Sequence, residues 1–145
     1  MAAALRSQAR LRALDALIRV EGPVHVIDIV RDLWAWCLDD ASADQPTITL
    51  ALPDVLLDPS PEMLLRLTSR INDAAIQSRS GLDVLLHAAG ICTPSGTVCA
   101  LVGPSGAGKT TAALTLGQDR WGYVTDETVA IDAVGTVRAF PKPLA

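Results

Sequence analysis

The stretch "TVCALVGPSGAGKTTAALTLG", residues 97–117, joins an apolar run, a glycine-rich loop and a helix-forming run. Its start is rich in β-branched and apolar residues, as is typical of a buried strand. The loop, residues 103–108, is followed by a run with the composition of a short helix that ends at Gly117. The pattern G-x-x-x-x-G-K-[ST] is matched at every fixed position. In this strand–loop–helix context it predicts an α/β fold and a phosphate-binding loop (P-loop).

The chemistry of phosphate binding explains the residue types in this loop. A phosphate chain needs convergent N–H donors, and we expect the three loop glycines to supply the positive φ that this curvature requires. The N–H groups at the start of the helix point at the same anion. We expect Lys109 to neutralise the β- and γ-phosphates and the Thr110 hydroxyl to bind Mg²⁺. The residues expected around the phosphates are Gly103, Pro104, Ser105, Gly106, Ala107, Gly108, Lys109, Thr110 and Thr111.

Short strands are predicted on both sides of the loop and helix. The apolar runs at residues 85–91 and 97–102 flank "CTPSG", which predicts a hairpin turn. After the helix, "WGYVTDE" predicts a strand, and "TVAID" and "TVRAF" predict a second hairpin around "AVG". We therefore expect residues 82–145 to form the nucleotide-binding core. Residues 1–81 are expected to form a mixed α/β region of unknown role.

Asp126 and His87 are, with Lys109, the candidate catalytic side chains, and Asp126 and Glu127 are, with Thr110, the candidate ligands of Mg²⁺. Asp126 and Glu127 follow the strand after the helix. A kinase needs a carboxylate near Mg²⁺ and a base for the acceptor hydroxyl, and ligands bind at the carboxyl ends of strands. We therefore expect both acids beside the loop, although an ordinary turn between strands also explains them. His87 fits either a catalytic group or a buried structural histidine, and His25 is assigned a structural role.

The segment "LLHAAGICTPSGTVCALVGPSGAGKTTAALTLGQDRWGYVTDETVAID" resembles the catalytic core of the HPr kinase/phosphorylase family. Phosphoenolpyruvate carboxykinases share this core more distantly. The resemblance implies an ATP- and Mg²⁺-dependent kinase that phosphorylates a hydroxyl, with Ser on a protein or peptide as the expected acceptor. It implies that Asp126 handles the acceptor's proton and that Glu127, where the family usually has Asp, lies near Mg²⁺. It further implies that His87 assists beside the phosphates, and the preference for ATP over GTP rests on it alone.

The resemblance covers roughly residues 84–143, and the family continues further with a segment that binds the acceptor. We therefore expect that the sequence represents a fragment, a truncated form or one part of a split protein, and that the last predicted strands need further partners. A non-catalytic nucleotide-binding regulatory or accessory module is the alternative function. A transporter-type ATPase is disfavoured, because such enzymes place far more sequence between the loop and their Mg²⁺-binding acid.

The region before residue 82 carries alternating helix and strand signals. An amphipathic helix is predicted over residues 1–20, with a transit peptide as the alternative. A strand is predicted at 24–29, a helix at 30–38 and a strand at 47–52 that buries Ile48, Leu50 and Leu52. The segment 57–81 predicts a helix capped by Ser60, with Pro61 at its first position and Gly81 beyond its end. Its packing face is expected to contain Leu64, Leu67, Ile71 and Ala74 or Ala75.

The composition of the chain argues against some classes of binding partner. The net charge is −4 and the pI is about 5.0, which argues against nucleic acid or an anionic membrane as the main partner. No segment has the long apolar run of a membrane span. Cys37, Cys92 and Cys99 are odd in number and lack metal-ligand spacing, so we expect reduced thiols in the cytoplasm. The sequence is compatible with a homo-oligomer.

Overall fold

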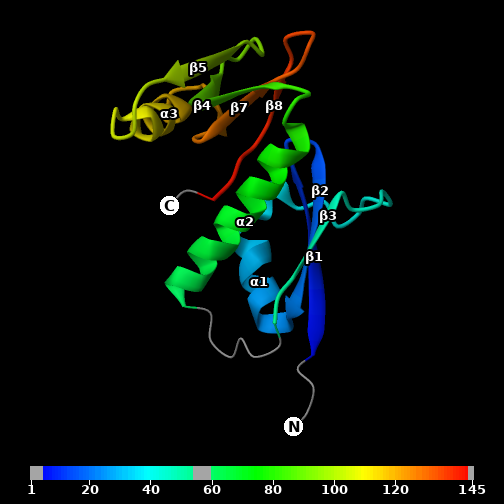
Figure 1. Ribbon diagram of the computed structural model, residues 1–145. Helices are drawn as coiled ribbons and strands as arrows, with labels where there is room; N and C mark the ends of the chain where they lie inside the picture. Colours follow the sequence, from blue (N-terminus) through cyan, green and yellow to red (C-terminus); the bar gives the residue numbers. More distant parts are fainter. Residues whose placement is uncertain (1–4, 54–59, 144–145) are drawn as a thin grey trace. The chain divides into compact units, whose positions relative to one another are not determined.

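A computed structural model describes residues 5–53 and 60–143, and the chain divides into two compact units, residues 1–78 and 79–145. Within the described residues the protein is mixed α/β, with two sheets and three α-helices (Figure 1). None of these helices is both long and apolar enough to cross a membrane.

The first unit contains a three-stranded sheet with the order β1-β2-β3. Strands β1 (Arg6–Ala13) and β2 (Ala16–Pro23) form an antiparallel hairpin, and β3 (Ile48–Ala51) pairs parallel to β2. Helix α1 (Val24–Leu33) and the short 3₁₀ helix η1 (Ala35–Cys37) lie in the connection between β2 and β3. The confirmed strand at residues 47–52 buries Leu50 and Leu52, whereas Ile48 is half-buried.

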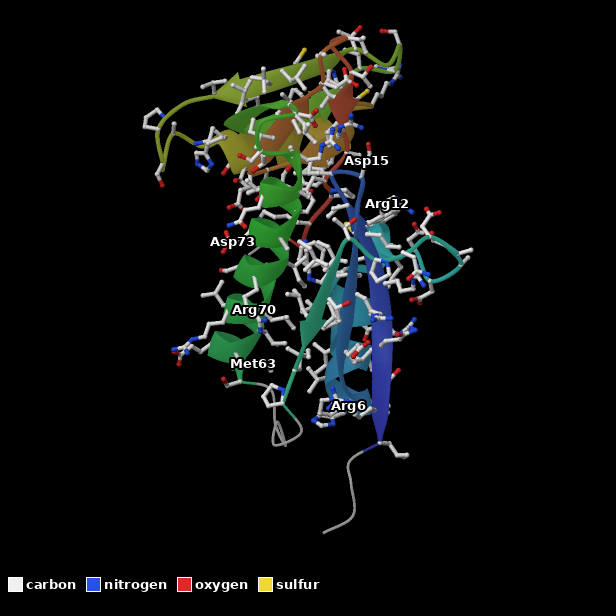
Figure 2. The ribbon with its side chains drawn as sticks, turned by 45° about the vertical axis from the view of Figure 1, so that its right-hand side comes forward. Arg6, Arg12, Asp15, Met63, Arg70 and Asp73 are labelled. Atoms are coloured by element: carbon white, nitrogen blue, oxygen red, sulfur yellow. The ribbon has the colours of Figure 1, made fainter. Side chains whose placement is uncertain are left out.

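The predicted N-terminal helix is wrong, because the described part of residues 1–20 forms the β1–β2 hairpin. Residues 1–4 of that prediction lie outside the described residues. Leu14 and Asp15 turn the chain with φ of 50° and 66°, as in a type I′ turn. Asp15 lies at the tip of the hairpin and Arg12 lies on β1 (Figure 2). Ala9, Leu11 and Ala13 are fully buried at every second position, which is the pattern of a strand with one buried face.

The predicted strand at residues 24–29 is also wrong, because α1 occupies this segment. Val26, Ile27 and Val30 are fully or almost fully buried at the spacing of one helix face. The predicted helix at residues 30–38 is correct only for its first turn, since α1 ends at Leu33 and η1 follows. The β-branched residues of this segment favour a strand locally. Tertiary packing of the apolar face outweighs this preference and stabilises a helix.

Helix α2 (Pro61–Arg79) is confirmed together with its N-terminal cap. The Ser60 hydroxyl accepts a hydrogen bond of 3.2 Å from the Met63 N–H, and Pro61 is the first helical residue. The predicted packing stripe is buried at Leu67, Ile71, Ala74 and Ala75, and half-buried at Leu64. Residues 57–59 of the predicted segment lie outside the described residues.

The second unit contains a five-stranded sheet. Its strands are β4 (Val84–Cys92), β5 (Val98–Val102), β6 (Gly122–Thr125), β7 (Thr128–Ile131) and β8 (Val137–Arg138). The order is β5-β4-β7-β8, β6 also pairs with β4, and all these pairings are antiparallel. Helix α3 (Lys109–Gln118) lies beside β4 and β5 (Figure 1) and also packs on β6. Ala89, Ile91 and Ala113 form the core between the helix and the sheet.

Both predicted hairpins of this unit are present. The Thr93 N–H donates to the Thr97 carbonyl at 2.8 Å, and the Asp132 N–H donates to the Thr136 carbonyl at 3.0 Å. The predicted end of the helix at Gly117 is wrong by one residue, because α3 continues through Gln118. Arg120, with a φ of 81°, supplies the left-handed conformation after the helix in place of the predicted glycine.

Candidate functional site

The second unit contains a cavity of about 420 Å³. This volume lies within the range of small-molecule sites. The cavity brings together side chains from the glycine-rich loop, from the start of α3, from the β6–β7 junction and from β4. The lining residues are His87, Ser105, Gly106, Gly108, Lys109, Thr110, Thr111, Asp126, Glu127 and Lys142. The loop, both acids and His87, which the sequence suggested separately, therefore meet at one place, and Lys142 joins them.

The glycine-rich loop follows β5 directly and curls back on itself. Gly106 and Gly108 have φ of 80° and 81°, and a Cβ added to either would meet no other atom within 4 Å. Positive φ, rather than crowding, is therefore what favours glycine at these two positions. The prediction of positive φ is wrong for Gly103. A Cβ there would lie 3.3 Å from the Ala107 Cβ, so this position favours glycine because of close packing within the loop.

Lys109 closes the loop through its own side chain. Its Nζ donates to the carbonyl oxygens of Gly103 at 2.7 Å and Pro104 at 2.9 Å. The residue is also the first of α3, and the preceding Gly108 has no side chain that could cap the helix. The N–H groups of the first helical turn therefore point into the loop without competition from a capping side chain. Together with the ammonium group they make this end of the cavity electropositive.

The two acids lie at a junction between β6 and β7. Both strands pair with the same edge of β4, with Gly90 opposite Thr125 and His87 opposite Thr128, and the register of the β4–β6 pair shifts between Gly90 and Ile91. The Thr125 hydroxyl accepts N–H groups from Glu127 at 3.3 Å and Thr128 at 3.4 Å. This local arrangement interrupts the strand at the two acids. Because the strand is interrupted, the two acidic side chains do not have to alternate between opposite faces of the sheet, and both can line the cavity.

Polar contacts surround the Asp126 carboxylate. Its Oδ1 accepts a hydrogen bond of 3.0 Å from the Tyr123 hydroxyl and lies 3.4 Å from the Lys142 Nζ. The same Nζ lies 3.0 Å from Oε2 of Glu127. The Lys142 and Asp126 side chains are only 8% and 9% exposed, whereas that of Glu127 is 35% exposed. Lys142 therefore bridges both acids at the inner wall of the cavity, and Glu127 is the more accessible of the two.

Lys142 is the functional candidate that sequence reasoning missed. The Phe140 N–H donates to the Val124 carbonyl at 3.2 Å, and the Lys142 N–H donates to the Phe140 carbonyl at 2.8 Å. Phe140 is fully buried, so the segment before Lys142 is anchored beside β6. One sequence signal was available: Lys109 and Lys142 are the two lysines of a chain that otherwise uses arginine for positive charge. Both line the cavity.

His87 is an exposed residue of the cavity wall. It lies on β4 two residues before Ala89, which packs in the core with α3, so strand alternation places both on the same face of the sheet. This position does not fit the buried structural histidine that was the alternative. His25 is exposed on α1 in the first unit, away from the cavity residues in sequence.

Three side chains of the cavity carry oxygen atoms of the kinds that bind Mg²⁺. Within residues 5–53 and 60–143, no group of three or more His, Cys, Asp and Glu side chains could hold a metal ion. Thr110, Asp126 and Glu127 offer hydroxyl and carboxylate oxygens, which Mg²⁺ prefers when phosphate oxygens complete its coordination. The three cysteines, all among the described residues, are thiols rather than disulfides, and burial raises the pKa of the Cys37 thiol to about 11.

Comparison of the chain with protein-family models, with curated proteins and with solved structures finds no match. The functional interpretation therefore depends on the residues of the cavity and on the resemblance carried by residues 84–143.

Proposed function

We propose that the second unit binds Mg·ATP and transfers the γ-phosphoryl group to a hydroxyl, with Ser of a protein or peptide as the acceptor. The observation that carries this proposal is the single cavity in which the glycine-rich loop, the Asp126–Glu127 pair and His87 meet. A phosphoryl-transfer site needs these three components close together: donors for phosphate, acids for metal and acceptor, and room for the reacting groups. The HPr kinase-like type of core and the choice of ATP come from the resemblance.

The residues present fit a nucleoside triphosphate and its metal. The open space around Gly106 and Gly108 leaves room for a phosphate to approach the backbone. When bound, Mg²⁺ would neutralise charge on the phosphates during transfer. Thr110 and Glu127 would hold the ion, with Asp126 beside it.

Each side chain has a role that its position allows. Lys109 exchanges the Gly103 and Pro104 carbonyls for phosphate oxygens. Asp126 orients the acceptor hydroxyl and takes its proton as the hydroxyl oxygen bonds to the γ-phosphorus. The bond between this phosphorus and the β–γ bridging oxygen breaks at the same time, and ADP leaves. His87, which lies on the exposed wall of the cavity, would contact the transferring phosphoryl group.

A second function, nucleotide binding without transfer, is favoured by one observation. Oδ1 of Asp126 already contacts both the Tyr123 hydroxyl and the Lys142 ammonium group. A base held by two donors is less available to an acceptor hydroxyl. In this case the unit would act as a regulatory module that senses nucleotide.

The two functions are separated by two measurements on the same protein. Calorimetric titration with Mg·ATP and Mg·GTP tests binding and base preference, and single-turnover labelling with γ-labelled ATP and Ser-containing peptides tests transfer. Binding with labelling supports the kinase, and binding without labelling or phosphate release supports the sensing module. If the protein binds neither nucleotide, both proposed functions are excluded. The matched control is Arg66→Ala, which deletes an exposed cation on α2 that pairs with Glu62.

A further inference from the structure

Lys142 holds a position that is unusual for a lysine. Lys142 is only 9% exposed, and its Nζ lies 3.0 Å from Glu127 Oε2 and 3.4 Å from Asp126 Oδ1. Two neighbouring carboxylates at a largely buried wall repel each other unless a cation lies between them. The ammonium group supplies that cation from within the chain. It therefore does for the pair what a bound metal ion would otherwise do.

We propose that Lys142 is a resident counter-ion of the Asp126–Glu127 pair, which a divalent cation must displace when it binds with nucleotide. This inference rests on the proposed function, because the displaced contacts belong to the same metal site. The competition follows from the geometry at Asp126, whose Oδ1 already contacts Tyr123 and Lys142. A metal ion that approaches this oxygen must compete with the ammonium group for its lone pairs and for its charge.

The fold lets the ammonium group move while the chain stays in place. The backbone before Lys142 is fixed by the buried Phe140 and by the hydrogen bond from the Phe140 N–H to Val124. The lysine itself has a four-carbon side chain with freely rotating bonds. Once displaced, the ammonium group remains in the cavity that the phosphates would fill and can contact their oxygens. Mg²⁺ alone offers the lysine no new partner, so Mg²⁺ should bind well only together with nucleotide.

The test measures thermal unfolding with Mg²⁺ as the only added ligand. For the parent protein we expect millimolar Mg²⁺ to change the Tm by less than about 2 °C. Lys142→Met should lower the Tm by about 5–10 °C without Mg²⁺, because it leaves two carboxylates without their cation. Mg²⁺ should restore most of this loss. NaCl at equal ionic strength should not, which separates binding from screening.

Further variants separate charge from packing. Lys142→Met combined with Glu127→Gln leaves the net charge of the three residues at positions 126, 127 and 142 as it is in the parent, so the double variant should be folded and should lose the response to Mg²⁺. Lys142→Arg keeps a cation and should behave like the parent. Arg66→Met removes an exposed cation paired with Glu62 and should show no Mg²⁺-dependent Tm. If Lys142→Met does not fold, the double variant decides: a folded, Mg²⁺-independent protein supports the proposal, and an unfolded one overturns it.

Two results would overturn the proposal in the folded variants. One is a Tm loss in Lys142→Met that Mg²⁺ restores no better than NaCl does, which would make Lys142 a structural ion-pair partner only. The other is a parent protein that Mg²⁺ alone stabilises as strongly as it stabilises Lys142→Met. Because these measurements use Mg²⁺ without nucleotide, they stand apart from the proposed function. Failure of the parent to bind Mg·ATP refutes nucleotide binding, and the Mg²⁺ response of Lys142→Met reports on the counter-ion separately.

Discussion

Lys109 and Lys142 hold their ammonium groups on different partners within one cavity. Lys109 donates to two neutral carbonyl oxygens of its own loop, whereas Lys142 contacts two carboxylates. Carbonyl contacts are weaker than contacts between opposite charges, so Lys109 is the one more easily released toward an incoming phosphate. We therefore expect Lys109 to leave its carbonyl contacts when a phosphate binds. Lys142 should keep its contacts with the two carboxylates until a metal ion displaces it.

Lys109→Ala should remove most nucleotide affinity and leave the fold intact. A charge-assisted hydrogen bond contributes about 1.5–3 kcal/mol, so we expect Mg·ATP to bind roughly 10–100-fold more weakly. The side chain is only half-buried and its loss leaves no core cavity. Calorimetric titration measures the affinity, and circular dichroism checks the fold. Affinity equal to that of Arg66→Ala would show that the loop does not bind phosphate.

Asp126→Asn should spare nucleotide binding and slow phosphoryl transfer. Asn keeps the shape and can still accept the Tyr123 hydroxyl, but it cannot take the acceptor's proton. A general base contributes about 10²–10⁴-fold to a rate, which sets the expected loss. Single-turnover kinetics with a phosphorylatable acceptor measures it. A transfer rate equal to that of the parent would exclude Asp126 as the base.

Glu127→Gln should raise the Mg²⁺ concentration needed for half-maximal nucleotide binding. Glu127 is the more exposed acid, and in the proposed function it holds the ion together with Thr110. Loss of one charged ligand worth about 1.4 kcal/mol corresponds to a tenfold change. Titrations with ATP at a series of Mg²⁺ concentrations measure the effect. Identical Mg²⁺ dependence in the variant and the parent would remove Glu127 from the metal site.

At the scale of elements, one carboxylate ties together the start and the end of the second unit's sheet. Asp83, just before β4, accepts hydrogen bonds from Arg79 at 2.7 and 2.8 Å and from Arg138 of β8 at 2.8 Å. Its side chain is only 1% exposed. The hydrogen bonds from Arg79 are the main reason that the pKa of Asp83 lies below its ordinary value. This lowered pKa makes the ion-pair cluster a pH-dependent contribution to stability.

Asp83→Asn should destabilise the protein near neutral pH and should matter less in acid. Because the folded-state pKa is lowered, the stabilisation is fully present above about pH 5 and is lost as pH falls through the folded-state pKa. The free energies of unfolding of parent and variant should therefore converge toward low pH. Urea unfolding at a series of pH values measures this. A difference that stays constant with pH would mean that Asp83 contributes through packing or neutral hydrogen bonds alone.

The elements also differ in how far the sequence could predict them. Helix α2 was predictable because Ser60 and Pro61 signal its start and its apolar residues repeat only at helical spacing. The β1–β2 hairpin was not, because its apolar residues satisfy both periods and its turn uses Leu14 and Asp15 instead of glycine. Lys142 was missed as well, because its contacts with Asp126 and Glu127 depend on how the chain between them folds through β7 and β8. Local motifs thus suggested most of the candidate site, and tertiary contacts supplied the rest.

At the scale of the whole molecule, the division into two compact units has a measurable consequence. All residues that line the cavity belong to the unit formed by residues 79–145. Amide groups near a bound ligand exchange more slowly, because the ligand raises the free energy of local opening. Nucleotide should therefore protect one unit selectively.

Hydrogen exchange followed by mass spectrometry should show this selectivity. With Mg·ATP we expect slower exchange in the glycine-rich loop, α3 and the β6–β7 junction, and little change in β1 and β2. Free ATP without Mg²⁺ should protect the loop more than the junction, since the acids respond to the metal. Equal protection across both units would contradict a site confined to residues 79–145.

Because both lysines line the cavity, lysine side chains can serve as spectroscopic probes of the cavity. Lys109 and Lys142 are the only two lysines in the sequence. Protein grown with isotope-labelled lysine would therefore give side-chain NMR signals from the cavity alone, against a silent background. The Lys109 signal would report the loss of its contacts with the loop carbonyls. The Lys142 signal would report its displacement from Asp126 and Glu127. The order in which they shift during a titration would reveal whether phosphate or metal arrives first.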